Sequence, residues 1–95
     1  MTDKKAHRKN TLVKASALIT GDRATEYGDA YENHERIAKI WSVLLIKDIT
    51  VEQVYQCMIA VKLSRLIETP NHEDSYVDIC GYSALASEAM DKKNT

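Results

Sequence analysis

Apolar residues recur along this chain every three to four positions, which is the period expected of helices that bury one face. The pattern predicts four helices, over about residues 11–20, 29–46, 50–68 and 72–91. No segment alternates apolar and polar residues in the manner of a half-buried strand. Because the connections are short, consecutive helices should lie antiparallel. The sequence therefore predicts an all-α fold, a compact antiparallel bundle of about four helices, completed by oligomerisation because so short a chain buries only a modest core.

Three of the predicted helices begin with a capping residue and a Glu, Gln or Asp three positions later. The pairs are Asp29 with Glu32, Thr50 with Gln53, and Asn71 with Asp74. In the last helix, Asp78 lies one turn beyond Asp74 on the same face. Capping explains Asp74 but not Asp78, and a carboxylate on a face that should be buried needs a cation, a metal or a ligand.

Two further features concern how the predicted helices pack. The second helix has an apolar stripe that should be buried, formed by Ala30, Ile37, Ala38, Trp41, Leu44 and Leu45. The fourth helix contains Gly81, which costs about 1 kcal/mol relative to alanine in a helix interior. A glycine there indicates the close approach of another helix or of a ligand, and helix packing is the commoner cause.

The composition is that of one ordinary soluble domain. The 95 residues are 44% hydrophobic and 28% charged, and the formal net charge is −1. We expect a basic flexible arm over residues 1–10, a single helical domain over 11–91 and a frayed tail over 92–95. The arm could contact nucleic acid, but such a start is more often a solvated tail, so nucleic acid is not an expected partner. Without a signal peptide or a bilayer-spanning run, a cytoplasmic protein with no membrane partner is expected.

Two carboxylate pairs lie on neighbouring predicted helices. Glu32 and Glu35 are three residues apart on the second helix, and Asp74 and Asp78 are four apart on the fourth. Mg²⁺ prefers such oxygen ligands and usually keeps waters and substrate phosphate oxygens as well. The spacing therefore predicts these four carboxylates as candidate magnesium ligands, although capping alone would explain Glu32 and Asp74.

Cationic and aromatic residues could complete a nucleotide site around those carboxylates. Lys62 and Arg65 lie one turn apart beside the apolar stripe of the third helix, and with Arg23 they could contact phosphates. Tyr27, Trp41 or Tyr82 could stack on a base, although Trp41 is more often a core residue. The simpler interpretation is that Lys62 and Arg65 extend their charges into water, or that one of them forms a structural ion pair with Asp78.

Several short strings stand out when the chain is taken as a whole. They are Gly21-Asp22-Arg23, Glu26-Tyr27-Gly28-Asp29, Lys62-Leu63-Ser64-Arg65, Asp74-Ser75 and Asp78-Ile79-Cys80-Gly81-Tyr82. With these strings the chain resembles a small all-helical family of uncharacterised function encoded by phages and prophages. That family is similar to the nucleotide-modification-associated domain and, more distantly, to the all-α NTP pyrophosphatases of the MazG type.

The resemblance implies an all-helical fold, oligomerisation and a link to nucleotides. The positions it implicates in nucleotide binding are Arg23, Tyr27, Asn33, Lys62, Arg65, Asp78 and Tyr82. Of the MazG-type magnesium motif, ExxE followed by ExxD, only the first half is present, as Glu32-x-x-Glu35. Asp74-x-x-x-Asp78 stands in place of the second half, which argues against pyrophosphatase chemistry.

The leading hypothesis is a phage nucleotide-binding protein that acts in the host cytoplasm. As an enzyme, it would use Mg²⁺ for nucleotide pyrophosphohydrolysis or phosphoryl transfer. As a binding protein, it would sequester a nucleotide second messenger and so block host defence. A third hypothesis is a helical protein that binds and inhibits a host protein. The chain has no GxxxxGK[ST] loop, so P-loop phosphoryl transfer is excluded.

Overall fold

The computed structural model describes residues 3–21 and 30–93, and within those ranges the secondary structure is entirely helical. The helices are α1 (Lys4–Thr20), α3 (Ala30–Leu45), α4 (Val51–Glu68) and α5 (Glu73–Lys93). The prediction of an all-α fold is confirmed. None of the described helices is both long enough and apolar enough to span a membrane.

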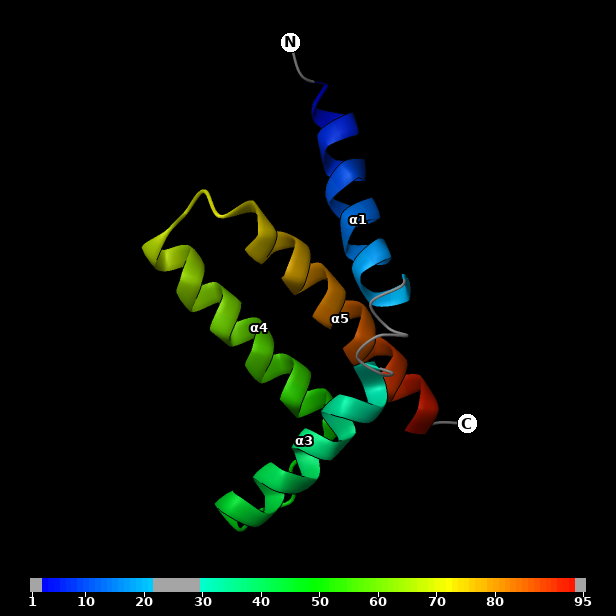
Figure 1. Ribbon diagram of the computed structural model, residues 1–95, viewed down its shortest axis with the longest axis vertical. Coiled ribbons are helices and arrows are strands. Elements are labelled where there is room, and N and C mark those ends of the chain that lie inside the picture. The colour runs from blue at the N-terminus through cyan, green and yellow to red at the C-terminus, as the bar shows by residue number, and fades with distance from the viewer. Residues whose placement is uncertain (1–2, 22–29, 94–95) are drawn as a thin grey trace.

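The most extensive packing joins α4 and α5, which form an antiparallel pair (Figure 1). Helix α1 lies on α5 and runs in roughly the same direction (Figure 1). Helix α3 packs mainly on α4, and the two helices cross near the start of α4 (Figure 1). The last turns of α3 therefore extend beyond the rest of the molecule. This differs from a bundle in which every helix lies along its sequence neighbour, because α1 packs on the helix most distant from it in the chain.

The core lies where the end of α1, the starts of α3 and α4, and the second half of α5 meet. Val51, Tyr55, Leu85 and Ala89 form its buried cluster. Half-buried side chains pack against that cluster, namely Ile19, Ala30, Tyr31, Tyr82 and Ala86. All four helices thus contribute to one small core.

The helix starts follow from their capping residues. Thr50 and Gln53 form the predicted capping box of α4, with the Thr50 side chain accepting from the Gln53 N–H and the Gln53 side chain from the Thr50 N–H. Helix α1 begins at Lys4, earlier than the expected residue 11, because the Asp3 carboxylate accepts from the Lys5 N–H at 3.0 Å. Residues 4–10, expected within a flexible arm, are helical and exposed on every side.

The predicted cap of α5 is wrong. Asn71 belongs to a turn closed by a hydrogen bond from the His72 N–H to the Thr69 carbonyl, 3.0 Å long, and the helix begins only at Glu73. Pro70 and Asn71 suit the two central positions of such a turn, so the turn takes the residue that would otherwise cap the helix. His72 precedes the helix instead, and its Nδ1 lies 2.7 Å from the hydroxyl of the buried Ser75.

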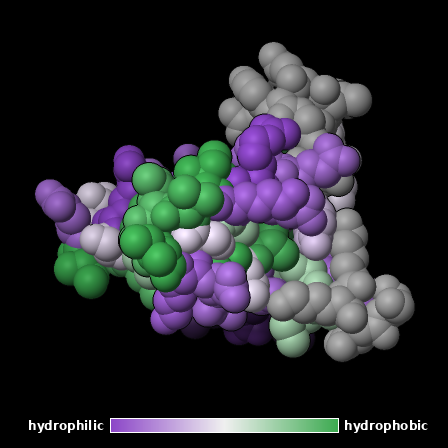
Figure 2. Space-filling view, turned by 90° about the horizontal axis from the view of Figure 1, so that it is seen from below, coloured by the Kyte–Doolittle hydropathy of each residue, from purple (hydrophilic) through white to green (hydrophobic). Residues whose placement is uncertain are grey.

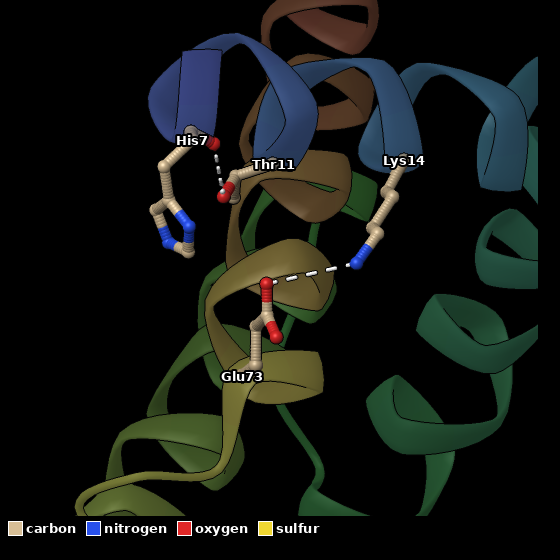
Figure 3. A network of polar contacts seen from close by, with 4 residues as sticks. All are labelled: His7, Thr11, Lys14 and Glu73. Atoms are coloured by element: carbon tan, nitrogen blue, oxygen red, sulfur yellow. Dashed lines mark hydrogen bonds and ion pairs between the residues drawn. The ribbon is translucent and has the colours of Figure 1, made fainter. Parts of the chain in front are cut away.

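Gly81 is explained by the packing of α1 on α5. A Cβ atom at this position would lie 3.2 Å from Cγ2 of Ile19, closer than side chains normally approach. Helix packing, the commoner of the two predicted causes, is therefore the reason for the glycine. A second contact between the same helices is the ion pair of Lys14 with Glu73, 3.6 Å long, whose half-exposed partners contribute little stability (Figure 3).

The apolar stripe predicted for the second helix is buried only in part. Ala38 is 5% exposed, but Leu44 and Leu45 are 71% and 64% exposed. The expectation that these two leucines are buried is wrong, because α3 meets α4 near the start of α3, and its last turns extend beyond that contact (Figure 1).

Candidate functional site

A half-buried ion pair joins the two central helices. Lys62 Nζ of α4 lies 3.0 Å from Asp78 Oδ2 of α5, and both side chains are 24% exposed. Lys62 and Asp78 each lie on the helix face that is turned toward the other helix. Most of the positions one turn away from Lys62 are apolar. The sequence offered a structural ion pair of Asp78 with either Lys62 or Arg65, and in the structure the partner is Lys62.

Three aromatic rings meet one to two turns away from the ion pair. The ring centroid of His34 (α3) lies 4.5 Å from that of Tyr55 (α4) and 5.8 Å from that of Tyr82 (α5), and the two tyrosine rings are 6.3 Å apart. These separations are typical of tilted and edge-to-face aromatic contacts. Tyr55 is fully buried, whereas His34 and Tyr82 are half-buried and reach the surface.

One backbone carbonyl fixes the orientation of two of these rings. His34 Nδ1 lies 2.8 Å from the Ala30 carbonyl oxygen, and the Tyr55 hydroxyl donates to the same oxygen over 3.4 Å. A carbonyl only accepts, so His34 Nδ1 carries a hydrogen and donates it to this oxygen. The first turn of α3 thereby orients the imidazole with respect to both tyrosines.

The ion pair and the tyrosine rings lie on shared faces of α4 and α5, and we call the five residues the seam: His34, Tyr55, Lys62, Asp78 and Tyr82. Asp78 and Tyr82 are one turn apart on the same face of α5, about 6 Å along the axis. Tyr55 and Lys62 are two turns apart on α4, about 10 Å along the axis. The seam thus presents a charged end and an aromatic end within the length of a small ligand.

Residues 10–90 match the family described as "Domain of unknown function (DUF6378)". The chain belongs to the DUF6378 family. The match includes every residue of the seam, all of α3 and α4 and most of α1 and α5, so the seam is part of the DUF6378 domain itself.

Two curated phage proteins are similar to this DUF6378 chain. The Gene 55 protein of Mycobacterium phage L5 is 44% identical over 75 residues, covering 78% of this chain and 48% of that protein. The Gene 55 protein of Mycobacterium phage D29 is 39% identical over 72 residues, with 76% and 48% covered. The chain therefore spans about half the length of the curated relatives it matches. No solved structure matches the chain.

The DUF6378 structure brings together three of the residues predicted to bind a nucleotide, Lys62, Asp78 and Tyr82. Arg65 is exposed one turn beyond Lys62, and Asn33 is exposed on α3 next to His34. Arg23 and Tyr27 lie outside the described residues. A nucleotide site at these positions stays a prediction.

The four predicted magnesium ligands are not brought together. Glu32, Glu35 and Asp74 are exposed, and Asp78 is paired with Lys62. Over residues 3–21 and 30–93, no three His, Cys, Asp or Glu side chains form a group able to hold a metal ion. Magnesium binding therefore remains a prediction that rests on the sequence.

The sequence carries no signal that His34 and Tyr55 meet. They lie on different helices, and only the packing of three helices brings their rings into contact. Glu52 is 6% exposed in the first turn of α4, one turn before Tyr55. From the sequence alone a glutamate in a first helical turn is explained by the helix dipole, so its burial gave no signal.

The ion pair of the seam should contribute measurably to stability. In a double-mutant cycle with Lys62→Met and Asp78→Asn, we expect a coupling free energy of about 1–2 kcal/mol, between the values for exposed and for buried pairs. Urea unfolding of the four proteins measures it. The matched control is the Lys14–Glu73 pair, whose partners are half-exposed and whose coupling should be below about 0.5 kcal/mol. Equal coupling in the two cycles would contradict a special role for the seam pair.

Proposed function

We propose that this protein is phage-encoded and binds a nucleotide at the seam. The observation that carries the proposal is the Lys62–Asp78 pair one turn from the half-exposed ring of Tyr82. A cation beside an accessible aromatic ring matches the two unlike parts of a nucleotide, the phosphates and the base. The similarity to proteins of two mycobacteriophages supports the phage origin.

In the proposed complex, the Lys62 ammonium group contacts a phosphate while it stays bound to Asp78. An ammonium group has three donors, so it can serve both partners, and the carboxylate then orients it. Arg65, exposed one turn further along α4, adds a second cation for the phosphates. Tyr82 stacks on the base, next to the His34 ring, whose centroid is 5.8 Å from that of Tyr82.

We favour binding without turnover over hydrolysis. Magnesium-dependent pyrophosphohydrolysis of the MazG type needs several carboxylates around the metal, whereas Glu32, Glu35 and Asp74 are exposed and do not group with Asp78. A protein that sequesters a nucleotide or a nucleotide second messenger needs only the cation and the ring. The Mg²⁺ enzyme is the alternative that the experiment must distinguish.

The proposal is tested by incubating the protein with NTPs, dNTPs and cyclic dinucleotides, with and without Mg²⁺, followed by mass spectrometry of the nucleotides. We expect one class of nucleotide to be recovered unchanged from the denatured protein. Tyr82→Leu, which keeps apolar volume but removes the ring, should weaken binding by about 10- to 100-fold. The control is Tyr76→Leu, which removes a ring that is 51% exposed on the same helix.

Two outcomes would contradict this proposal. Magnesium-dependent conversion of the nucleotide would show that the protein is an enzyme and would contradict sequestration. If no nucleotide binds with a dissociation constant below about 1 mM, the proposal that the protein binds a nucleotide is wrong.

A further inference from the structure

The end of α3 carries the largest continuous set of exposed apolar side chains among the described residues. Ile40, Val43, Leu44, Leu45 and Ile46 are 52%, 77%, 71%, 64% and 92% exposed. In Figure 2 they form the green patch over the tip of α3 and the turn that follows it. We call these five residues the α3 tip.

The α3 tip continues a helix face that is already partly buried. Ile37, Ile40, Trp41, Leu44 and Leu45 follow the i, i+3, i+4, i+7, i+8 spacing of a stripe that packs on another helix. Ile37 and Trp41, nearer the start, are half-buried, whereas Ile40, Leu44 and Leu45 are exposed. The spacing thus specifies a helix contact of which the described residues cover only the first half.

Ile46 shows that the tip is more than an incidental apolar surface. Its φ of 52° lies in the left-handed region, which is unfavourable for a β-branched residue. The Lys47 N–H donates to the Ser42 carbonyl over 3.2 Å, the helix-ending pattern in which glycine normally occupies the position of Ile46. Ser42 also holds the following segment, since its hydroxyl accepts from the Ile49 N–H at 2.9 Å.

The backbone at position 46 is therefore fixed by its neighbours in a conformation that glycine would adopt with less strain. The isoleucine side chain is 92% exposed, so little of its apolar surface is buried. A strained backbone combined with an exposed apolar side chain indicates a contact that the single chain does not contain.

The amount of exposed surface supports the same conclusion. The chain exposes 7176 Å² for a mass of 10.7 kDa, whereas a folded monomer of that mass exposes about 5500 Å². The Cα radius of gyration is 14.8 Å, compared with about 12 Å for a compact chain of this length. Residues 4–10, which are exposed on every side, account for part of this excess, and the α3 tip accounts for another part. A standard interface buries roughly 800 Å² on each partner, which is less than the total excess.

We propose that the α3 tip is the interface of a homodimer, in which the tips of two copies pack on each other across a two-fold axis. An apolar stripe complements itself, so a two-fold contact buries the same residues on both copies. Residues 43–46 carry no charge, and the net charge of −1 produces little repulsion between copies. The inference does not depend on nucleotide binding, because no residue of the seam belongs to the tip.

The dimer is tested by sedimentation equilibrium of the full chain up to about 1 mM. We expect the wild-type protein to have the mass of two chains. Leu44→Asp places a charge in the contact on both copies and should weaken association by at least about a hundredfold. Ile46→Gly should also weaken association, while the melting temperature at low protein concentration stays equal or rises because the left-handed strain is relieved.

The control is Ile67→Asp, at a residue of α4 that is 85% exposed and outside the tip. This variant should keep the dimer mass. The proposal is overturned if the wild-type chain stays monomeric over the whole concentration range, or if Leu44→Asp and Ile67→Asp affect association equally. A monomeric chain whose tip binds another protein would also overturn it.

Discussion

Replacing Tyr55 with alanine is expected to lower the free energy of unfolding by about 3–5 kcal/mol. Tyr55 is fully buried, belongs to the core cluster with Val51, Leu85 and Ala89, and contacts the rings of His34 and Tyr82. Its removal leaves a cavity at the point where all four helices meet, so no single helix can move in to fill it. Urea unfolding followed by circular dichroism at the helix band measures the loss.

Tyr55→Phe is the matched control, since it keeps the ring and removes only the hydroxyl. That hydroxyl donates to the Ala30 carbonyl over the long distance of 3.4 Å, so a smaller loss of about 1 kcal/mol is expected. If Tyr55→Ala costs less than about 1 kcal/mol, the core described here does not hold the helices together. If the phenylalanine variant is as unstable as the alanine variant, the hydroxyl rather than the ring is the important group.

Replacing Gly81 with leucine should separate α1 from α5. The first side-chain atom would already lie 3.2 Å from Ile19 Cγ2, and the rest of a leucine has no space between the two helices. We expect a loss of at least about 2 kcal/mol, because the strain of overpacking exceeds the gain in helix propensity. Hydrogen exchange of residues 11–20 should rise in this variant more than that of α4.

Ala84→Leu is the control for that experiment, since Ala84 is exposed on the same helix. It should change the free energy of unfolding by less than about 0.5 kcal/mol. Adding Ile19→Ala to Gly81→Leu should restore part of the lost stability by opening space for the leucine. A Gly81→Leu protein with wild-type stability and unchanged exchange in α1 would show that the two helices do not pack as described.

The helices could be predicted from the sequence because their signals are local. The apolar period located all four, and the Thr50–Gln53 capping box of α4 was predicted correctly. The two wrong starts have local causes as well. At the start of α5, Asn71 is part of a turn and therefore does not cap the helix. At the start of α1, Asp3 caps a stretch whose many charges predicted a solvated tail.

The tertiary contacts could be predicted only in part. Helical spacing placed Lys62 and Asp78 on facing sides of two helices, so their pairing was one of a few open alternatives. Spacing shows that a face is apolar but not what covers it, and for this reason Leu44 and Leu45 were expected to be buried. The contact of His34 with Tyr55 and Tyr82 needs three helices in place, and no pattern within one helix contains that information.

The packing of α1 on α5 also has a consequence for the order of folding. Helices α4 and α5 are joined by a four-residue turn, so their pairing closes only a short loop, and the capping box at Thr50 favours an early start of α4. Ile19 and Gly81, in contrast, are separated by roughly 60 residues of chain. The hairpin of α4 and α5 should therefore form first and serve as the surface onto which α1 condenses, and in the native state α1 should open before the hairpin does.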